Sequence, residues 1–207
     1  MSFFDFHHHK NYQNGIYNLN FSENIPEVYF SAGIHPKDID ENWKSNFQMI
    51  KKLSLNENCL AIGECGLDGL IDIDEKLQEE VFENHILWAN EIRKPVIIHC
   101  VRRFSQLFKF SKIADVALII HGFNKKKNIA DELFNAGFYL SFGRAVLQNV
   151  SLQTLIKDFP VGRMFLETDD ACFNIEELYQ KVSELKNIST ENLQNQILEN
   201  LERIRNL

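Results

Sequence analysis

Several features are missing from this sequence, and each absence excludes a class of protein. None of the four cysteines pairs with another in a C-x-x-C motif, and no positively charged, apolar signal segment opens the chain. A reducing, cytoplasmic location is therefore expected. No apolar run approaches the roughly 18 residues of a membrane span, so we expect a soluble protein with no membrane partner.

Excess positive charge is missing as well. The chain has 22 Lys and Arg against 29 Asp and Glu, a formal net charge of -7. Such a surface is poorly suited to holding duplex DNA through many phosphate contacts. The densest basic run, Lys125 to Lys127, is most simply a solvated helix start. If the substrate is a nucleic acid, metal ions and a few basic residues must attract it.

The 207 residues contain no internal repeat, low-complexity tract or linker. We therefore expect a single domain, residues 1–207, which is long enough to bury an apolar core without disulfides or a structural metal. Any bound metal is accordingly expected to be catalytic.

Short apolar runs alternate with longer amphipathic stretches along most of the chain. The runs are nearly continuous in Ile, Val, Leu and Phe, as is typical of strands that are covered on both faces. They occupy residues 29–35, 59–67, 95–100, 116–123, 138–143 and 163–169. The stretches between them carry apolar residues at helical spacings, and Asn174 and Ser189 are the expected caps of the last two helices. This alternation predicts βα repetition around a parallel sheet.

Residues 3–9 are expected to form a further strand, and residues 15–21 would bring the number to eight, which closes a (β/α)8 barrel. We thus expect an α/β fold, a TIM-like barrel with a truncated first βα unit. Only Lys10 to Asn14 separate the two segments, whereas a parallel crossover needs about a dozen residues. Residues 16–21 are expected either to pair antiparallel, as the Asn14-Gly15 turn signal favours, or to form an irregular cover over the rim.

Six of the seven histidines lie at or near the end of a predicted strand, on the face of a barrel that builds active sites. In the first strand, the alternation of side chains places His7 and His9 inside the barrel and His8 outside. An H-x-H pair of this kind can bind one metal ion through two neutral imidazoles, with Asp5 as an outer partner that orients a ring. His8 is not expected to be a ligand.

Four other strand ends carry candidate ligands. His99 and His121 each end a strongly apolar strand, Glu64 follows another between two glycines, and Asp169 ends the last. Singly, each residue has an ordinary alternative, because a histidine can be part of the core and a carboxylate can cap a helix. As a set they predict a binuclear site for Zn, Mn, Mg, Co or Fe, in which Glu64 could bridge the two cations.

The order of these motifs resembles that of the TatD family of metal-dependent hydrolases. The matching elements are D-x-H-x-H at 5–9, G-x-H-P at 33–36, G-E-x-G-L-D at 63–68, P-V-x-I-H at 95–99, H-x-F at 121–123 and E-T-D at 167–169. The resemblance implies a TIM-barrel, nuclease-like phosphodiesterase with two divalent cations. By motif position, the first cation would be held by His7, His9 and Asp169. The second would be held by His99 and His121, with Glu64 as the bridge.

The chain departs from the family pattern in four places, one of which is the Gly-Phe-Asn that follows His121, where a small polar residue and a glycine are common further on in the family. The residues after E-T-D are Asp170, Ala171 and Cys172, where the family commonly has a proline. The arginine that follows the P-V-x-I-H element stands one place later, as Arg102. The first βα unit is truncated. These departures leave the expected ligands in place and bear on the range of substrates.

The resemblance and the residues together predict a reaction. Water activated by the cations would attack phosphorus, with Asp169 as general base and Glu64 as the second catalytic residue. His35 and Arg102 are the candidate phosphate contacts, and Arg103 is the second choice. Asp68 and Glu167 would be supporting acids, although Glu167 could equally be structural.

The expected substrate is single-stranded DNA, which would be cut from its ends, and no obligate protein partner is implied. Two alternatives stay open at this point. One is a metal-dependent hydrolase of carboxylic esters or amides on the same barrel. The other is a metal-binding scaffold without catalytic activity.

Overall fold

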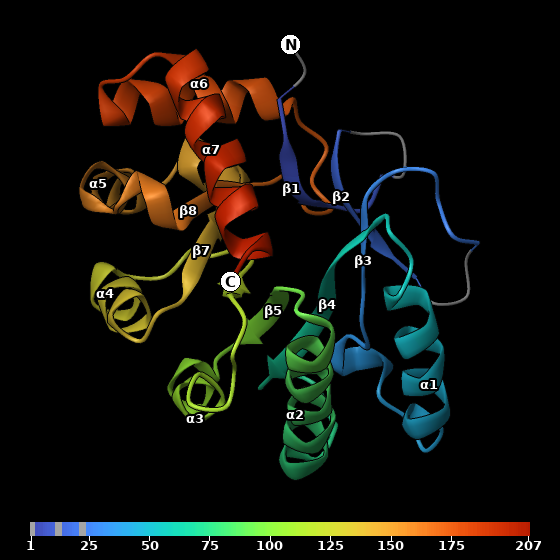
Figure 1. The fold of residues 1–207 in the computed structure, drawn as a ribbon. Helices are drawn as coiled ribbons and strands as arrows, with labels where there is room; N and C mark the ends of the chain where they lie inside the picture. Colours follow the sequence, from blue (N-terminus) through green and yellow to red (C-terminus); the bar gives the residue numbers. More distant parts are fainter. Residues whose placement is uncertain (1–2, 11–13, 21–23) are drawn as a thin grey trace.

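The computed structural model describes residues 3–10, 14–20 and 24–207, which form a sheet rolled into a barrel (Figure 1). Eight strands follow one another around the barrel in sequence order, each parallel to the next. They are β1 (Asp5–His8), β2 (Gly15–Leu19), β3 (Phe30–Ala32), β4 (Cys59–Asp68), β5 (Val96–Val101), β6 (Leu118–Ile120), β7 (Tyr139–Phe142) and β8 (Met164–Leu166). The fold class expected from the sequence is confirmed.

Helices connect the strands from β3 onward and pack around the outside of the barrel (Figure 1). The α-helices are α1 (Trp43–Ser54), α2 (Glu75–Ile92), α3 (Leu107–Phe110), α4 (Lys127–Asn135), α5 (Val150–Asp158), α6 (Ile175–Lys186) and α7 (Thr190–Arg205). Short 3-10 helices are η1 (Pro36–Asp38), η2 (Phe104–Gln106), η3 (Arg144–Leu147) and η4 (Val161–Arg163). Both expected caps are confirmed, because Asn174 and Ser189 accept backbone N–H bonds at the starts of α6 and α7.

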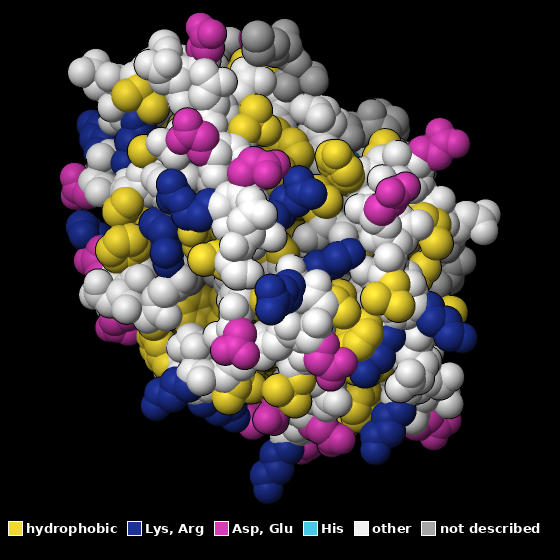
Figure 2. All heavy atoms as spheres, in the orientation of Figure 1, with side chains coloured by type: hydrophobic (Ala, Val, Ile, Leu, Met, Phe, Trp, Pro, Cys, Tyr) yellow, Lys and Arg dark blue, Asp and Glu magenta, His cyan; other side chains and the backbone are white. Residues whose placement is uncertain are grey.

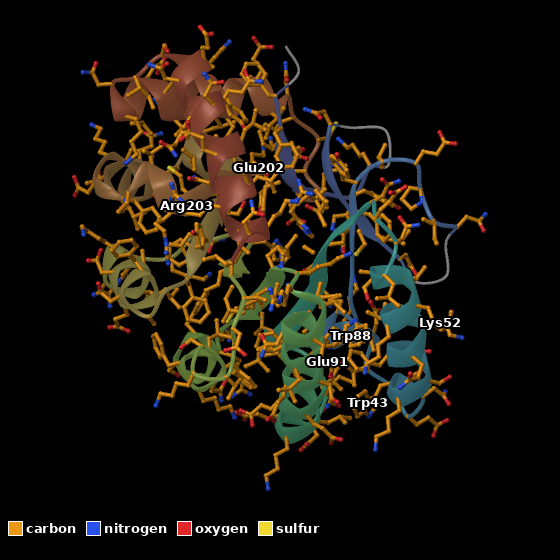
Figure 3. The ribbon with its side chains drawn as sticks, in the orientation of Figure 1. Trp43, Lys52, Trp88, Glu91, Glu202 and Arg203 are labelled. Atoms are coloured by element: carbon orange, nitrogen blue, oxygen red, sulfur yellow. The ribbon has the colours of Figure 1, made fainter. Side chains whose placement is uncertain are left out.

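The apolar runs of the sequence form the interior. All ten residues of β4 are buried, as expected for a strand covered on both faces. At the interface of α1 and α2, Trp88 donates a hydrogen bond to Ser54, and Trp43 and Trp88 lie between the two helices (Figure 3). Among the described residues, no helix is long and apolar enough to cross a membrane.

Helix α7 lies near the amino ends of the central strands. Arg205, its last residue, lines one cavity together with Cys59 and Pro95, where β4 and β5 begin. On the face that carries α7, basic and acidic side chains are interspersed (Figure 2). The candidate ligands, by contrast, lie in the carboxyl-terminal half of a strand or just beyond its end, at the other end of the barrel.

The sequence-based expectation for the second segment is wrong. Residues 16–20 neither pair antiparallel nor form an irregular cover, because β2 is parallel to both β1 and β3; residue 21 lies outside the described residues. The connection from His9 to Asn14 can extend to roughly 20 Å, which exceeds the roughly 13 Å length of a four-residue strand such as β1. A short parallel return is therefore possible without a helix.

The position of Gly15 explains why the Asn14-Gly15 pair led to the wrong prediction of antiparallel pairing. A Cβ atom on Gly15 would lie 1.9 Å from the carbonyl oxygen of Asp5, so only glycine permits this approach of β2 to β1. The glycine serves strand contact rather than a hairpin turn.

The barrel closes where β1 meets the end of β8. A parallel bridge joins His8 to Asp169, and the Asp169 N–H donates to the His7 carbonyl at 2.9 Å. Asp5 adds a side-chain link, since its carboxylate accepts bonds from the backbone N–H and hydroxyl of Thr168 at 2.8 and 2.6 Å. Asp5, which was expected to orient a histidine ring, instead bonds the strand on the other side of the seam.

Replacement of Thr168 by Val should therefore destabilise the fold. The variant leaves the buried Asp5 carboxylate without its hydroxyl donor, at a cost of about 1–3 kcal/mol in the free energy of unfolding. Urea unfolding at neutral pH measures the change. Thr168→Ser, which keeps the hydroxyl, is the control, and equal stabilities of the two variants would contradict a role for this bond.

His85 of α2 is a structural histidine that titrates outside the usual range. Its Nδ1 lies 2.7 Å from the Val81 carbonyl, so the neutral ring carries its proton there and Nε2 accepts the Ile34 N–H at 3.0 Å. Burial lowers the pKa of His85 to about 4. The ring is fully buried and joins α2 to the segment that precedes His35.

This histidine should make the fold sensitive to acid. In the unfolded chain the group takes up a proton near pH 6.5, but in the folded chain only near pH 4, so the unfolded state binds more protons between these values. The contribution is complete above pH 6.5 and is lost as the pH falls toward 4, by up to roughly 3 kcal/mol. His85→Gln should lose less stability than the parent over this interval in urea unfolding. Parallel curves for the two proteins would refute the assignment.

Candidate metal centre

All six residues expected to bind metal lie together at the carboxyl end of the barrel. Histidine and carboxylate side chains form three groups whose ligand atoms lie within 4.8 Å of one another. The groups are His7, His9 and Asp169; His7, Glu64 and His121; and His35, Glu64 and His99. His8 is in none of the three, and its buried ring lies beside Tyr17. The structure thus separates His8 from its neighbours, in agreement with the strand alternation.

The first group joins β1 to the residue that closes the barrel. His9 Nε2 lies 3.4 Å from Asp169 Oδ1, and His7 Nε2 lies 3.7 Å from the same oxygen and 3.4 Å from Glu64 Oε2. Two atoms bound to one tetrahedral zinc at roughly 2.1 Å are themselves about 3.4 Å apart. These side chains could therefore hold one cation with little rearrangement.

The other two groups share Glu64. Its Oε1 lies 2.9 Å from both His99 Nδ1 and His121 Nε2 and 3.3 Å from His35 Nε2. His35 was expected to contact phosphate, but its ring lies among the candidate ligand atoms, 3.2 Å from His99 Nδ1. His35 also caps η1, because Nδ1 accepts the Lys37 N–H at 3.0 Å. It therefore caps the 3-10 helix that follows β3 and faces the site as well.

Glycines beside Glu64 allow this geometry. A Cβ at Gly63 would lie 2.4 Å from the Ile97 carbonyl oxygen, and one at Gly66 would lie 2.1 Å from that of His99. Both glycines have positive φ angles, 136° and 146°, which other residues rarely adopt. From the sequence, these glycines were expected to let another group approach the backbone beside Glu64. The group that approaches is β5, which carries His99.

Neighbouring charged groups keep the Glu64 carboxyl ionised. Burial alone would raise the pKa of this carboxyl, but His121 and the neighbouring imidazoles outweigh burial and hold the pKa well below its ordinary value. Burial would likewise lower the pKa of His121, but Glu64 and Glu167 raise it well above the usual range. A cation that replaces the proton on His121 would preserve this balance of charge.

Two further carboxylates lie behind the histidines. Asp68 Oδ2 is 3.1 Å from His99 Nε2, and Glu167 Oε1 is 3.5 Å from His121 Nδ1. Carboxylates in this position orient a ring and leave its other nitrogen for a metal. Asp68 and Glu167, which were expected to be supporting acids, are placed to act through His99 and His121.

His7 provides a direct test of whether a cation fits. Both of its ring nitrogens are buried, and within the described parts of the chain neither makes a hydrogen bond. Buried polar atoms without partners are uncommon, and a cation at Nε2 would supply one. The donors around it are imidazoles and carboxylates, a set that suits borderline and hard divalent cations.

Two candidate residues have a strained backbone. Asp169 and Arg102 have φ angles of 55° and 57°, in the left-handed region that non-glycine residues rarely adopt. The other non-glycine residues described with positive φ, Arg93 and Asn187, end α2 and α6, where this conformation is ordinary. In proteins, backbone strain away from helix ends is concentrated at functional sites. The alternative that Asp169 caps a helix is wrong, because the cap of α6 is Asn174.

The two candidate arginines differ in availability. Arg103 Nη1 lies 3.0 Å from Glu75 Oε2, whereas Arg102 is exposed and makes no ion pair with any residue that the structure describes. A guanidinium without a carboxylate partner is available to bind phosphate. The first choice made from the sequence, Arg102, is thus the available arginine.

Asn18 of β2 is absent from the sequence-based predictions, although its side chain bonds Glu64 at 3.1 Å. A signal was present, since Asn18 is a lone amide in the strand GIYNL. Its significance depended on the pairing of β2, which the sequence did not reveal.

Fold and site together define a class of protein, a (β/α)8 barrel with a cluster of imidazoles and carboxylates suited to divalent metals at the carboxyl ends of its strands. The family described as TatD related DNase matches residues 6–206. The chain belongs to this family, which confirms the resemblance seen in its motifs.

Curated relatives resemble most of the chain. The metal-dependent hydrolase YabD of Bacillus subtilis (strain 168) is 35% identical over 148 residues, which are 69% of this chain. The 3'-5' ssDNA/RNA exonuclease TatD of Edwardsiella piscicida is 28% identical over 160 residues, 73% of this chain. The matches cover 58% and 61% of these two proteins, so the chain spans less than two thirds of their length.

A solved structure agrees over nearly the whole fold. The TatD homologue YJJV of Escherichia coli K12 superposes with a TM-score of 0.83, covering 99% of this chain and 98% of the other, at 18% identity. Similarity at this identity supports the barrel architecture.

The adjacent residues His8 and His9 offer a matched test of the metal centre. His9→Gln should lower the number of bound ions, because it removes a candidate ligand that lies 3.4 Å from Asp169. His8→Gln should leave the number unchanged, because His8 is outside every ligand group. Elemental analysis after reconstitution with Mn²⁺ and dialysis measures the ion content. Loss of metal from the His8 variant alone would contradict the site.

Proposed function

We propose that this protein is a two-metal phosphodiesterase, a TatD-type exonuclease that acts on the ends of single-stranded DNA. The observation that carries the proposal is the position of Glu64, whose two oxygens face different histidines. Oε2 faces His7, and Oε1 faces His99 and His121. A carboxylate so placed can bridge two cations, which suits the attacking and leaving oxygens of a phosphodiester.

The residues that would hold the cations are His7, His9, Glu64, His99, His121 and Asp169, with His35 also within reach of Glu64. Bound divalent ions such as Mg, Mn, Zn, Co or Fe supply Lewis acidity, which makes water more acidic and stabilises negative charge on phosphate oxygens. The chain itself must orient the substrate and accept the proton.

Asp169 is the group proposed to accept it. Burial would raise the pKa of this carboxyl, but His9 and His121 lower it below its usual value, so the group is ionised at neutral pH. Its side chain is 36% exposed, enough for contact with water. An ionised carboxylate in this position can orient the attacking water and take its proton.

A cavity of about 160 Å³ adjoins the centre and is lined by His9, Asn18, His35 and Lys37, among others. Lys37 follows β3 and Arg102 follows β5, so these exposed cations come from loops on either side of β4, the strand that carries Glu64. Together with His35 they could contact phosphates around the centre. A few cations of this kind suit a single strand better than a duplex.

The choice of substrate also draws on the family. The relative from Edwardsiella piscicida is named as a 3'-5' exonuclease of single-stranded DNA and RNA, and the family is described as DNases. Carboxylic esters and amides are the competing substrates, because the same activated water could attack a carbonyl.

A comparative assay tests the proposal. Protein reconstituted with Mg²⁺ or Mn²⁺ is incubated with 5'-labelled single-stranded DNA, bis(p-nitrophenyl) phosphate and a p-nitrophenyl carboxylic ester. We expect the DNA to shorten from one end and the phosphodiester to be hydrolysed. Glu64→Gln should lower both rates by at least about a hundredfold, more than the loss typical of a residue behind a metal ligand.

Glu57→Gln is the control, because Glu57 is an exposed carboxylate in the cavity near α7, and it should retain full activity. Ester turnover without any loss of DNA would replace the nuclease by an ester hydrolase. Metal binding without turnover of any of the three substrates would indicate a scaffold.

A further inference from the structure

Asn18 holds Glu64 at two points. Its Nδ2 donates to Glu64 Oε2 at 3.1 Å, and its Oδ1 accepts the backbone N–H of Glu64 at 3.2 Å. One amide therefore bonds both the main chain and the carboxylate of a residue 46 positions away. These bonds link β2 to β4, across β3, at the floor of the cavity beside the metal centre.

The bond to the Glu64 main chain lies at an irregularity in the pairing of the strands. The register between β4 and β5 shifts between Ile62 and Cys65, so Glu64 lies within a break in the ladder. Irregularities of this kind redirect a side chain at the cost of regular backbone pairing. Asn18 supplies the acceptor that the Glu64 N–H needs, and so stabilises the bent segment.

The side-chain bond decides where each carboxylate oxygen points. Oε2 is directed to His7, while Oε1 is directed to His99 and His121. Rotation of the carboxylate would move the two oxygens away from these histidines. The amide occupies one lone pair of Oε2, which leaves another for a cation.

Asn18 differs in kind from the other partners of this carboxylate. Among the residues that the structure describes, the others are the histidines of the ligand groups. Their ring nitrogens would turn to the cations once metal is bound. Asn18 cannot be replaced in this way, so its amide would go on orienting Glu64 in the loaded site.

We propose that Asn18 is a positioning residue that fixes Glu64 as the bridge between two cations. The inference rests on the metal site of the proposed function and deepens it. Asn18 touches neither the attacking water nor the phosphate in this role, and acts only through Glu64. Loss of the Asn18 side chain should weaken the binding of the metal ions, because the Glu64 carboxylate that it orients would bind both of them.

Metal binding provides the test. Metal-free protein is titrated with Mn²⁺ in a calorimeter, for the parent chain and for Asn18→Leu, which has nearly the same shape but forms neither bond. We expect two ions in the parent and a dissociation constant raised about 10–100-fold for at least one ion in the variant. Asn18→Ala, which leaves space instead of filling it, is the second variant in case the first does not fold.

Ser31→Ala is the matched control. Ser31 is the register partner of Asn18 on β3, and its buried hydroxyl has no hydrogen-bond partner among the described residues. This variant should bind both ions like the parent. Thermal unfolding of the metal-free proteins shows whether each is folded, and raising Mn²⁺ should restore phosphodiester turnover to the Asn18 variants if positioning is their main defect.

The outcomes separate the two proposals. A folded Asn18 variant that binds both ions with parental affinity overturns the role of Asn18 and leaves the proposed function intact. Weakened binding in a protein that cleaves no phosphodiester supports Asn18 and overturns the proposed reaction. A parent chain that binds no metal at all overturns both.

Discussion

Closure of the barrel between β1 and β8 is the constraint on which the site depends. Among the described residues, the seam has one bridge, His8 with Asp169, and the buried pair of Asp5 and Thr168 adds a side-chain link. Residues of the first strand and residues just beyond the last strand meet here, and they include the first ligand group, His7 and His9 with Asp169. The contact that completes the sheet therefore assembles half of the candidate metal centre as well.

Several features of the site are unfavourable to the free energy of folding, and the packing of the surrounding barrel must offset them. Glu64 is a buried carboxylate, His7 has ring nitrogens without hydrogen-bond partners among the described residues, and Asp169 has a left-handed backbone. Each of these costs free energy in a folded chain. A divalent cation would offset the first two, because it would neutralise the Glu64 carboxylate and bind the His7 imidazole. On this fold, active sites lie at this face of the barrel, and the strained residues are confined to it.

Six strands and their connecting helices could be predicted from the sequence because their apolar runs are long, continuous and separated by helical patterns, and the first strand could be predicted from its alternation. The pairing of the second strand could not. Its segment offered a turn signal at Asn14-Gly15, and the short connection argued against a parallel return. Gly15 proved to be a point of close contact with Asp5, and the brevity of β1 makes the return possible. Asn18 was missed for the same reason, because its contact with Glu64 depends on which strands lie beside β2.

The sequence by itself determined the chemistry of the site and the fold class. Strand alternation separates His7 and His9 from His8, and the parallel arrangement brings the carboxyl ends of strands to one rim, so residue types and their order were sufficient. Only the tertiary structure decided which atoms meet. Whether Asp5 bonds a ring or Thr168, whether His35 faces Glu64, and which amide orients the bridge all depend on distances of a few ångströms between strands. Those distances follow from register and closure, which no local pattern encodes.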